Sequence, residues 1–314
     1  MSGKDIQYIL GRIGFWALIL LILFFIAFPF YWAFATSLKT ERELFAPAEL
    51  VPSTTTGSNY QPLVCFDGDN FVANAIRGVL DCDIVDEDTG EEVPVQFNSD
   101  FFTGLQNSAI VSFLSVLIAL VAGSFAAYAL GRIEFTGRMP MLYAVLAMTM
   151  FPQISILSGL FNIVSGLGAF GSINSLILTY PLLTLPFTVW VLTSFFQGLP
   201  AELEQAALVD GATPFQTFWR ILLPLTAPAL VTTGLLAFIA AWNEYLFALT
   251  FTTVNPEAKT VTVAIAQFSG QQARQEPIAE IMAASIVVTI PLLILVLIFQ
   301  NRIAEGLTAG AVKG

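Results

Sequence analysis

One carboxylate stands inside an apolar run of this chain, in the sequence A-W-N-E-Y-L-F-A-L around Glu244. A charge at the centre of a bilayer costs about 2.5–3.5 kcal/mol on insertion scales, so such a side chain must face a cavity or a partner. Asn243 can donate and accept hydrogen bonds, and Tyr245 offers a ring on which a sugar could stack. Two interpretations stay open: Asn243, Glu244 and Tyr245 line a translocation pathway, or Glu244 makes a hydrogen bond that locks neighbouring helices. Further polar residues within apolar runs are Gln153, Asn162 and Asn174.

Other chemistry is excluded by what the chain lacks. It has no histidine, which excludes a histidine-based triad, metal cluster or proton relay. Its four lysines, at positions 4, 39, 259 and 313, complete no phosphate-binding loop of the G-x-x-x-x-G-K-[ST] type. We therefore expect no catalytic residue, metal site or cofactor in this chain. If transport is driven by ATP, the ATP and Mg²⁺ belong to partner subunits.

The most ordered polar stretch is a loop between two apolar runs. Glu202 and Glu204 predict the first turn of a short helix, where carboxylates oppose the positive end of the helix dipole. Gly211 can adopt the left-handed conformation that ends such a helix. Thr213, with Gln216 three residues later, predicts a capping box at the start of a second helix. The pattern favours a docking site for another protein, and the alternative is a solvated connector.

The spacing of this loop resembles the EAA loop of ABC importer permeases, whose pattern is E-A-A, three residues, Gly, nine residues and I-x-L-P. The matching residues are Ala206, Ala207, Gly211, Ile221, Leu223 and Pro224. The glutamate position of the family holds Gln205, which departs from the pattern. The paired alanines leave a shallow helix face that another protein can approach closely. The resemblance implies that an ATPase subunit docks here, on Glu202, Glu204, Gln205, Ala206, Ala207, Asp210, Gly211, Ile221 and Pro224.

Two further runs resemble the same family. The sequence D-G-A-T-P at 210–214 is similar to its carbohydrate branch, specifically the smaller permease subunit of maltose-type importers. The sequence G-L-T-A-G-A-V-K-G at 306–314 is similar to the tail of that subunit, which implies that the tail lies between the ATPase subunits. The tail residues concerned are Gly306, Leu307, Thr308, Gly310 and Lys313. Since glycines disfavour a helix, we expect this tail to be extended.

Composition predicts a polytopic, all-α membrane protein. Of the 314 residues, 56% are hydrophobic and 11% are charged, and the mean hydropathy is +0.77. At about 20 residues per span, six helices are predicted. They lie at about 13–35, 109–130, 139–160, 173–196, 225–251 and 281–299. The first is too long for a secretory signal peptide, so we expect an uncleaved anchor. The predicted fold is the ABC importer type I permease fold, as the resemblance implies.

The loops predict the orientation. With both termini in the cytoplasm, the inner segments carry seven lysines and arginines and the outer segments carry five. Arg132 and Arg138 flank a short inner loop, where the positive-inside rule applies best. The coupling loop, at about 197–224, then lies in the cytoplasm. The expected location is the cell (inner or cytoplasmic) membrane.

The acidity of the chain is concentrated in one outer loop. Residues 36–101 hold 13 acidic and 3 basic residues, a net charge of −10 out of −11. This charge favours a solvated extension over a Ca²⁺ site, because EF-hand spacing is missing. Cys65 and Cys82 both lie in this loop, and an oxidising compartment favours a disulfide between them. Two free thiols are the alternative.

These features predict three parts: an N-terminal helix at 1–35, the acidic extracytoplasmic loop at 36–101 and a permease core at 102–314 with a tail at 301–314. The predicted function is the transmembrane subunit of an ATP-driven sugar importer. The expected partners are a second homologous permease, two ATP-binding subunits, an extracytoplasmic solute-binding protein and membrane lipid, with no nucleic acid. One alternative is an importer of an osmolyte glycoside or another small polar solute. A different class is a stand-alone ion-coupled carrier, which usually shows internal repeats.

Overall fold

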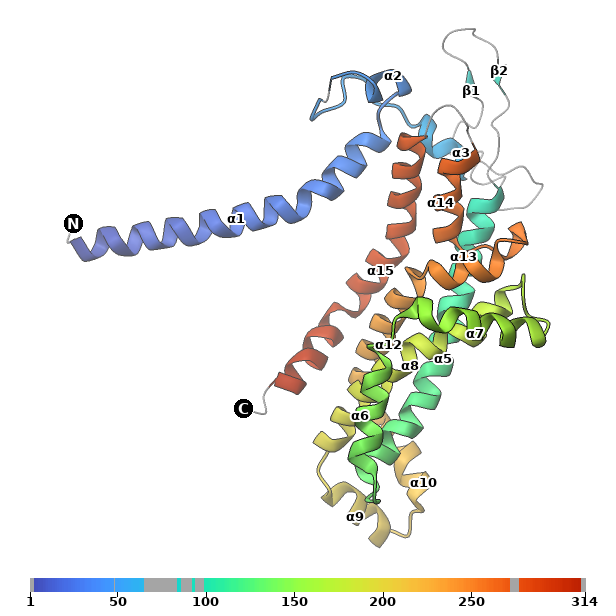
Figure 1. The fold of residues 1–314 in the computed structure, drawn as a ribbon. Helices are drawn as coiled ribbons and strands as arrows, with labels where there is room; N and C mark the ends of the chain where they lie inside the picture. The colour runs from blue at the N-terminus through green and yellow to red at the C-terminus, as the bar shows by residue number, and fades with distance from the viewer. Residues whose placement is uncertain are drawn as a thin grey trace. The chain divides into compact units, whose positions relative to one another are not determined.

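The computed structural model describes residues 3–47, 49–64, 84–85, 92–93, 99–271 and 277–311, and these are almost entirely helical (Figure 1). Before residue 99 the elements are α1 (Gly3–Ser37), α2 (Glu41–Leu44), η1 (Ser58–Tyr60), α3 (Gln61–Val64), β1 (Ile84–Val85) and β2 (Glu92–Val93). The longer helices that follow are α5 (Ser99–Arg132), α6 (Arg138–Met148), α7 (Gln153–Gly166), α8 (Ile173–Gly198), α12 (Ala227–Trp242), α14 (Val261–Gln271) and α15 (Ile278–Ala311). The shorter ones are α9 (Glu202–Val209), α10 (Pro214–Thr217), the π-helical turn η2 (Phe218–Leu222), α11 (Leu223–Leu225), α13 (Leu246–Thr252) and η3 (Pro256–Ala258). The two-residue strands β1 and β2 pair antiparallel, with Ile84 opposite Val93.

The predicted all-α membrane fold is confirmed. Four helices in the described part are long and apolar enough to cross a membrane: 11–37, 100–132, 173–198 and 278–302. Two bent helix pairs raise the number to six if each pair is one span. The first pair is α6 with α7, bent by 94°, and the second is the helix at 214–225 with α12, bent by 73°.

Two of the predicted spans are not single helices. The span predicted at 139–160 is divided between α6 and α7, because Pro152 takes an extended conformation, with ψ 125°, directly before α7. The span predicted at 225–251 stops at the end of α12, and α13 begins only at Leu246. Hydropathy averages over about 20 residues and is therefore insensitive to a break of three or four residues.

The chain divides into two compact units, one of residues up to 98 with 267–289 and the other of 99–266 with 290 onwards. In the second unit α5 and α8 form the main helix pair. Their axes approach closely because Gly123 has no side chain: a Cβ there would lie 2.7 Å from Thr188 Cγ2. The other helices of this unit, including α6, α12 and α13, pack against this pair.

The first unit contains an ordered segment after α1. The Lys39 side chain is 5% exposed; its Nζ donates to the Glu49 carbonyl at 2.8 Å and lies 5.0 Å from the centre of the Trp32 ring. The Glu43 carboxylate accepts hydrogen bonds from the Ser53 hydroxyl and from Thr54, and these bonds lower the pKa of Glu43. The beginning of the acidic loop is therefore folded onto the end of α1.

Candidate functional site

The polar loop after α8 folds as two short helices, α9 and α10, as its sequence predicts. Gly211 ends α9 with a φ of +79°, and its N–H donates to the Leu208 carbonyl at 3.1 Å. The predicted capping box is present at α10: Gln216 N donates to Thr213 Oγ1 at 3.3 Å, and Thr213 N donates to Gln216 Oε1 at 2.9 Å. Figure 1 shows α9 and α10 together at one end of the helices of the second unit.

The two faces of α9 differ in exposure. Ala207 is only 3% exposed and packs against its own chain, whereas Leu208 is 58% exposed and Val209 is 87% exposed. The shallow face that was expected from the paired alanines is therefore absent at Ala207, which is buried, and docking on the exposed Ala206 stays a prediction. The physical reason is the helical period, since neighbouring residues point about 100° apart. Glu202, Gln205, Asp210, Gly211 and Pro224 are exposed, and Glu204 and Ile221 are half-buried.

Arg132, the last residue of α5, ties this loop to the spans. Its Nε donates to Glu204 Oε1 at 3.1 Å, and the pair is an ion pair. Its guanidinium also donates to the Leu199 carbonyl at 2.9 Å and, at 3.3 Å, to the carbonyl of Pro200. A planar guanidinium suits such a fork of acceptors. Arg132 therefore binds the carbonyl groups that follow the end of α8 and holds the start of α9 in place through Glu204.

Sequence reasoning missed this role of Arg132. The sequence analysis used Arg132 only for the orientation of the chain and assigned no partner within the chain to Glu204. The available signal was an arginine at the end of a long apolar run, since a cation there complements the negative end of the helix dipole.

Aromatic side chains anchor the second helix of the loop. Phe218 of η2 is 2% exposed, and its ring centre lies 5.0 Å from that of Tyr128 on α5 and 6.0 Å from that of Phe196 on α8. Leu222 is fully buried in the same cluster. Phe215 and Trp219 remain 63% and 57% exposed. One face of this helix is thus fixed on the spans, and the other is free to meet lipid or protein.

Glu244 lies in the break between α12 and α13 and is 7% exposed. Its carboxylate caps α13: Oε1 accepts from Phe247 N at 2.8 Å, and Oε2 accepts from Ala248 N at 3.1 Å. Two N–H groups at the start of a helix lack partners within it, so a carboxylate there is stabilising. The carboxylate that was expected inside one continuous span instead lies between two consecutive helices and caps the second of them.

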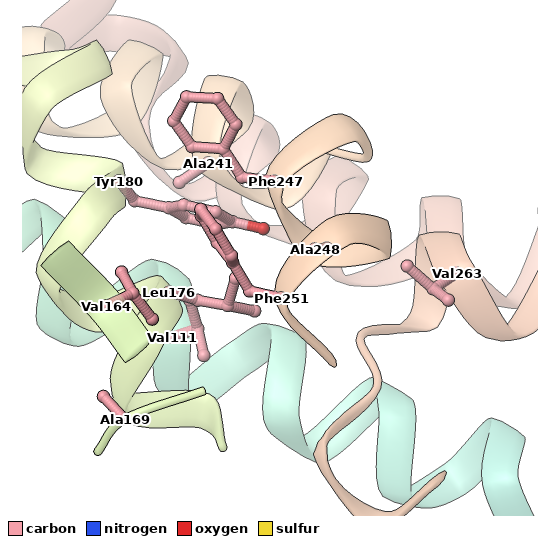
Figure 2. Close-up of a cluster of buried hydrophobic side chains, with 10 residues drawn as sticks. All are labelled: Val111, Val164, Ala169, Leu176, Tyr180, Ala241, Phe247, Ala248, Phe251 and Val263. Carbon is pink, nitrogen blue, oxygen red and sulfur yellow. The ribbon is translucent and has the colours of Figure 1, made fainter. Parts of the chain in front are cut away.

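Behind this break the second unit has a tightly packed apolar cluster. Figure 2 shows Tyr180 and Leu176 of α8 packed with Phe247, Ala248 and Phe251 of α13. All five are at most 1% exposed. The helix that follows the break, α13, is therefore packed tightly against α8.

A cavity of about 390 Å³ opens beside the break. Its lining joins the three predicted pathway residues and Gln153, a further polar candidate from the sequence, with residues that the sequence did not single out. The complete lining is Gln153, Tyr180, Leu183, Thr184, Ala240, Ala241, Asn243, Glu244, Tyr245 and Leu246. No local pattern could have found Tyr180 and Thr184, because they come from α8, more than 50 residues before Glu244.

Residues 256–260, which include η3, are fixed to the start of α5. Asn107 Nδ2 donates to the carbonyls of Glu257 and Lys259, at 2.8 and 2.9 Å. The Lys259 ammonium, 8% exposed, lies 3.6 Å from the Asp100 carboxylate. Asn107 itself is 8% exposed, so these bonds are shielded from water.

We expect Asn107→Ala to destabilise the folded protein by about 1–3 kcal/mol, since it leaves two shielded carbonyls without a donor. The measurement is thermal unfolding of the purified protein in detergent. Asn174→Ala, which removes an exposed asparagine from the start of α8, is the matched control and should unfold like the wild type. Equal stability of both variants would contradict the assignment.

The C-terminal tail differs from its prediction. Residues 301–311, with Gly306, Leu307, Thr308 and Gly310, continue α15 as helix rather than extended chain. Two glycines cost about 1 kcal/mol each, and a helix that is already formed over many apolar residues can propagate through them. The Thr232 hydroxyl also fixes this helix by donating to the Arg302 carbonyl at 3.0 Å. Lys313 lies outside the described residues.

Several other predicted features also lie outside the described residues, namely Cys65, Cys82 and most of the acidic loop. The disulfide stays a prediction. Within the described ranges no group of three His, Cys, Asp or Glu side chains could hold a metal ion.

The chain is thus a multi-pass helical membrane protein with an ordered, anchored polar loop at one end and a polar cavity among its helices. A family model described as "Binding-protein-dependent transport system inner membrane component" matches residues 102–308. The chain belongs to this family of transport permeases.

Individual relatives cover nearly the whole chain. The trehalose transport system permease protein SugB of Mycobacterium tuberculosis is 40% identical over 304 residues, 96% of this chain and 98% of that protein. The trehalose/maltose transport system permease protein MalG of Thermococcus litoralis is 48% identical over 210 residues, 67% of this chain and 75% of that protein. The sulfoquinovosyl glycerol transport system permease protein SmoH of Agrobacterium fabrum is 35% identical over 320 residues, covering 100% and 95%.

A solved structure of a bacterial ABC transporter involved in the import of the acidic polysaccharide alginate contains a similar chain. Its TM-score is 0.72 at 18% identity, and the match covers 96% of this chain and 98% of that one. This likeness confirms the ABC importer permease fold.

Proposed function

We propose that this chain is the transmembrane permease subunit of an ATP-driven ABC importer for a sugar. The observation that carries the proposal is the anchored loop: α9 exposes Leu208 and Val209 to solvent while Arg132 and Phe218 fix both of its halves on the spans. A force applied to α9 would therefore reach α5 and α8 directly. An exposed apolar end on a rigid support is typical of a docking surface.

The source of that force is a pair of ATP-binding partner subunits. The chain carries no phosphate-binding loop of its own. The family it belongs to transports solutes with the help of a binding protein, and the solved relative is an ABC transporter. ATP-driven closure of the partners would push α9 and tilt the spans between inward and outward access.

Sugars are the proposed solutes because three similar permeases are named for trehalose, maltose or a sulfoquinovosyl glycoside. An osmolyte glycoside is the alternative within the class. A solute-binding protein on the outer side delivers the substrate, and both termini and the coupling loop lie in the cytoplasm.

A second, homologous permease would complete the translocation pathway. Helix α1 exposes most of its large apolar side chains, among them Phe25 at 80% and Leu21 at 65%. Lipid and the second permease are the surfaces that would cover them.

A cysteine crosslinking experiment tests the docking. In membranes that hold the complete importer, we expect Val209→Cys to crosslink to an ATP-binding subunit through a short reagent with a maleimide at one end, which alkylates the thiol, and a photoreactive diazirine at the other, which inserts into the partner. Ala207→Cys, two residues away and buried, is the matched control and should not react. Capture of no ATP-hydrolysing subunit by Val209→Cys would overturn the docking assignment. Uptake that persists without ATP would favour the ion-coupled carrier.

A further inference from the structure

The cavity beside the break in the fifth span collects polar side chains from elements that are far apart in sequence. Gln153 comes from the start of α7, Tyr180 and Thr184 come from α8, and Asn243 to Tyr245 form the break itself. Six of its ten lining residues carry a polar group, and Glu244 is the only one of the six with a charged side chain. Polar side chains are expensive within a membrane, so their collection around one cavity of about 390 Å³ indicates a ligand site.

Some of these polar groups are already used within the protein. Both carboxylate oxygens of Glu244 accept N–H groups of α13. The Thr184 hydroxyl donates to the Tyr180 carbonyl at 3.3 Å. These groups shape the wall of the cavity.

Other groups remain available to a ligand. Asn243 donates one amide hydrogen to the Ile239 carbonyl at 2.8 Å, which leaves its other hydrogen and its side-chain oxygen unpaired among the described residues. The Gln153 amide makes no hydrogen bond to another described residue, and it is exposed. The Tyr245 side chain, in a residue that is 40% exposed, offers both a ring face and a hydroxyl. Amides that can donate and accept, beside an aromatic ring, match the hydroxyls and the apolar face of a sugar ring.

The charge of the lining restricts the ligand further. Glu244 is its one carboxylate, and none of the ten lining residues is a lysine or an arginine. A negative charge in surroundings of low dielectric repels another anion much more strongly than it would in water. The cavity therefore suits a neutral sugar and disfavours one that carries a carboxylate or sulfonate.

We propose that this cavity is a subsite for one ring of a neutral sugar, on this subunit of the importer. Gln153 and Asn243 exchange hydrogen bonds with the ring hydroxyls, and Tyr245 stacks on the ring. Glu244 is a positioning residue, since it fixes the break that presents Asn243 and Tyr245. The inference rests on the proposed import function and adds the substrate class and its contacts.

Protection from labelling tests the subsite without any contribution from the binding protein. Ala240→Cys places a thiol on the cavity wall in the assembled permease and ATPase complex in nanodiscs, and mass spectrometry follows its reaction with a maleimide. The probes are methyl glucoside and methyl glucuronide at millimolar concentration, which differ only in the carboxylate at carbon 6. We expect methyl glucoside to slow the reaction and methyl glucuronide to have no effect.

Variants of the lining sharpen the test. Asn243→Ala should raise the concentration of methyl glucoside needed for protection about tenfold, the effect of one lost hydrogen bond of about 1.4 kcal/mol. Asn162→Ala, an exposed asparagine of α7 outside the cavity, should leave it unchanged. Gln153→Lys should make methyl glucuronide protective, because it supplies the missing cation.

The possible outcomes distinguish failure of the sugar preference, of the subsite and of the proposed import function. Equal protection by the two probes would overturn the preference for neutral sugars. No protection by methyl glucoside, in a complex that still imports maltose or trehalose with ATP, would overturn the subsite but not the proposed function. No ATP-dependent import of either disaccharide would overturn the sugar importer itself.

Discussion

Arg132→Ala is expected to reduce ATP-driven uptake at least about tenfold while ATP hydrolysis by the assembled complex continues. The variant removes the ion pair with Glu204 and the hydrogen bonds to the carbonyls of Leu199 and Pro200. A hydrogen bond to a charged group contributes about 1.5–3 kcal/mol, so α9 loses much of its connection to α5 and α8. Motion of the ATP-binding partners would then move α9 without moving the spans. The measurement is the number of sugar molecules imported per ATP hydrolysed in proteoliposomes.

Two further variants separate positioning from folding. Arg132→Lys keeps the charge but loses the planar fork, so it should restore only part of the uptake. Arg138→Ala is the matched control: Arg138 donates to the Gly131 carbonyl at 2.8 Å and makes no hydrogen bond or ion pair with α9 in the described part of the chain. The number of sugar molecules that this variant imports per ATP should therefore stay normal. A wild-type ratio of imported sugar to hydrolysed ATP in Arg132→Ala would show that Arg132 plays no part in transmitting the motion of α9 to the spans.

Gly211→Pro is expected to abolish ATP-dependent uptake without preventing membrane insertion. Proline requires a φ near −65° and has no N–H, whereas Gly211 has a φ of +79° and donates to the Leu208 carbonyl. The turn between α9 and α10 cannot keep its shape, and the cost is about 3 kcal/mol or more. Uptake in membrane vesicles and the amount of protein in the membrane fraction are the two measurements.

Gly211→Asn provides the control for that experiment. Asparagine tolerates the left-handed conformation better than other residues with a side chain, and it keeps the N–H. We therefore expect it to retain most of the uptake, with Gly211→Ala between the two. Normal uptake by Gly211→Pro would remove the coupling role from this loop.

The exposure of the residues in α9 decides which substitution can test docking. Ala207→Arg would force a long cation into a site that is 3% exposed, so it would disrupt the packing of α9. Val209→Arg alters a side chain that is 87% exposed and leaves the packing intact. Loss of uptake by Val209→Arg, with normal amounts of protein in the membrane, is therefore the informative result.

The sequence by itself determined the features that depend on neighbouring residues. Four of the predicted spans as continuous helices, the left-handed Gly211 and the capping box of Thr213 with Gln216 were all predicted and are present. Helix caps and turns are made by groups a few residues apart, so local sequence specifies them. The family also follows from local spacing, since the residues that resemble it lie within two short runs.

Only the tertiary structure decided which side of each element is used. It buries Ala207 and exposes Val209, it joins Arg132 to Glu204 across 72 residues, and it brings Gln153 to the same cavity as Asn243. It also shows that Glu244, which the sequence places as an isolated charge within a span, caps the start of α13. The physical reason is that burial and long-range hydrogen bonds depend on how helices pack, and a hydropathy pattern shows that a helix is apolar without showing what it touches.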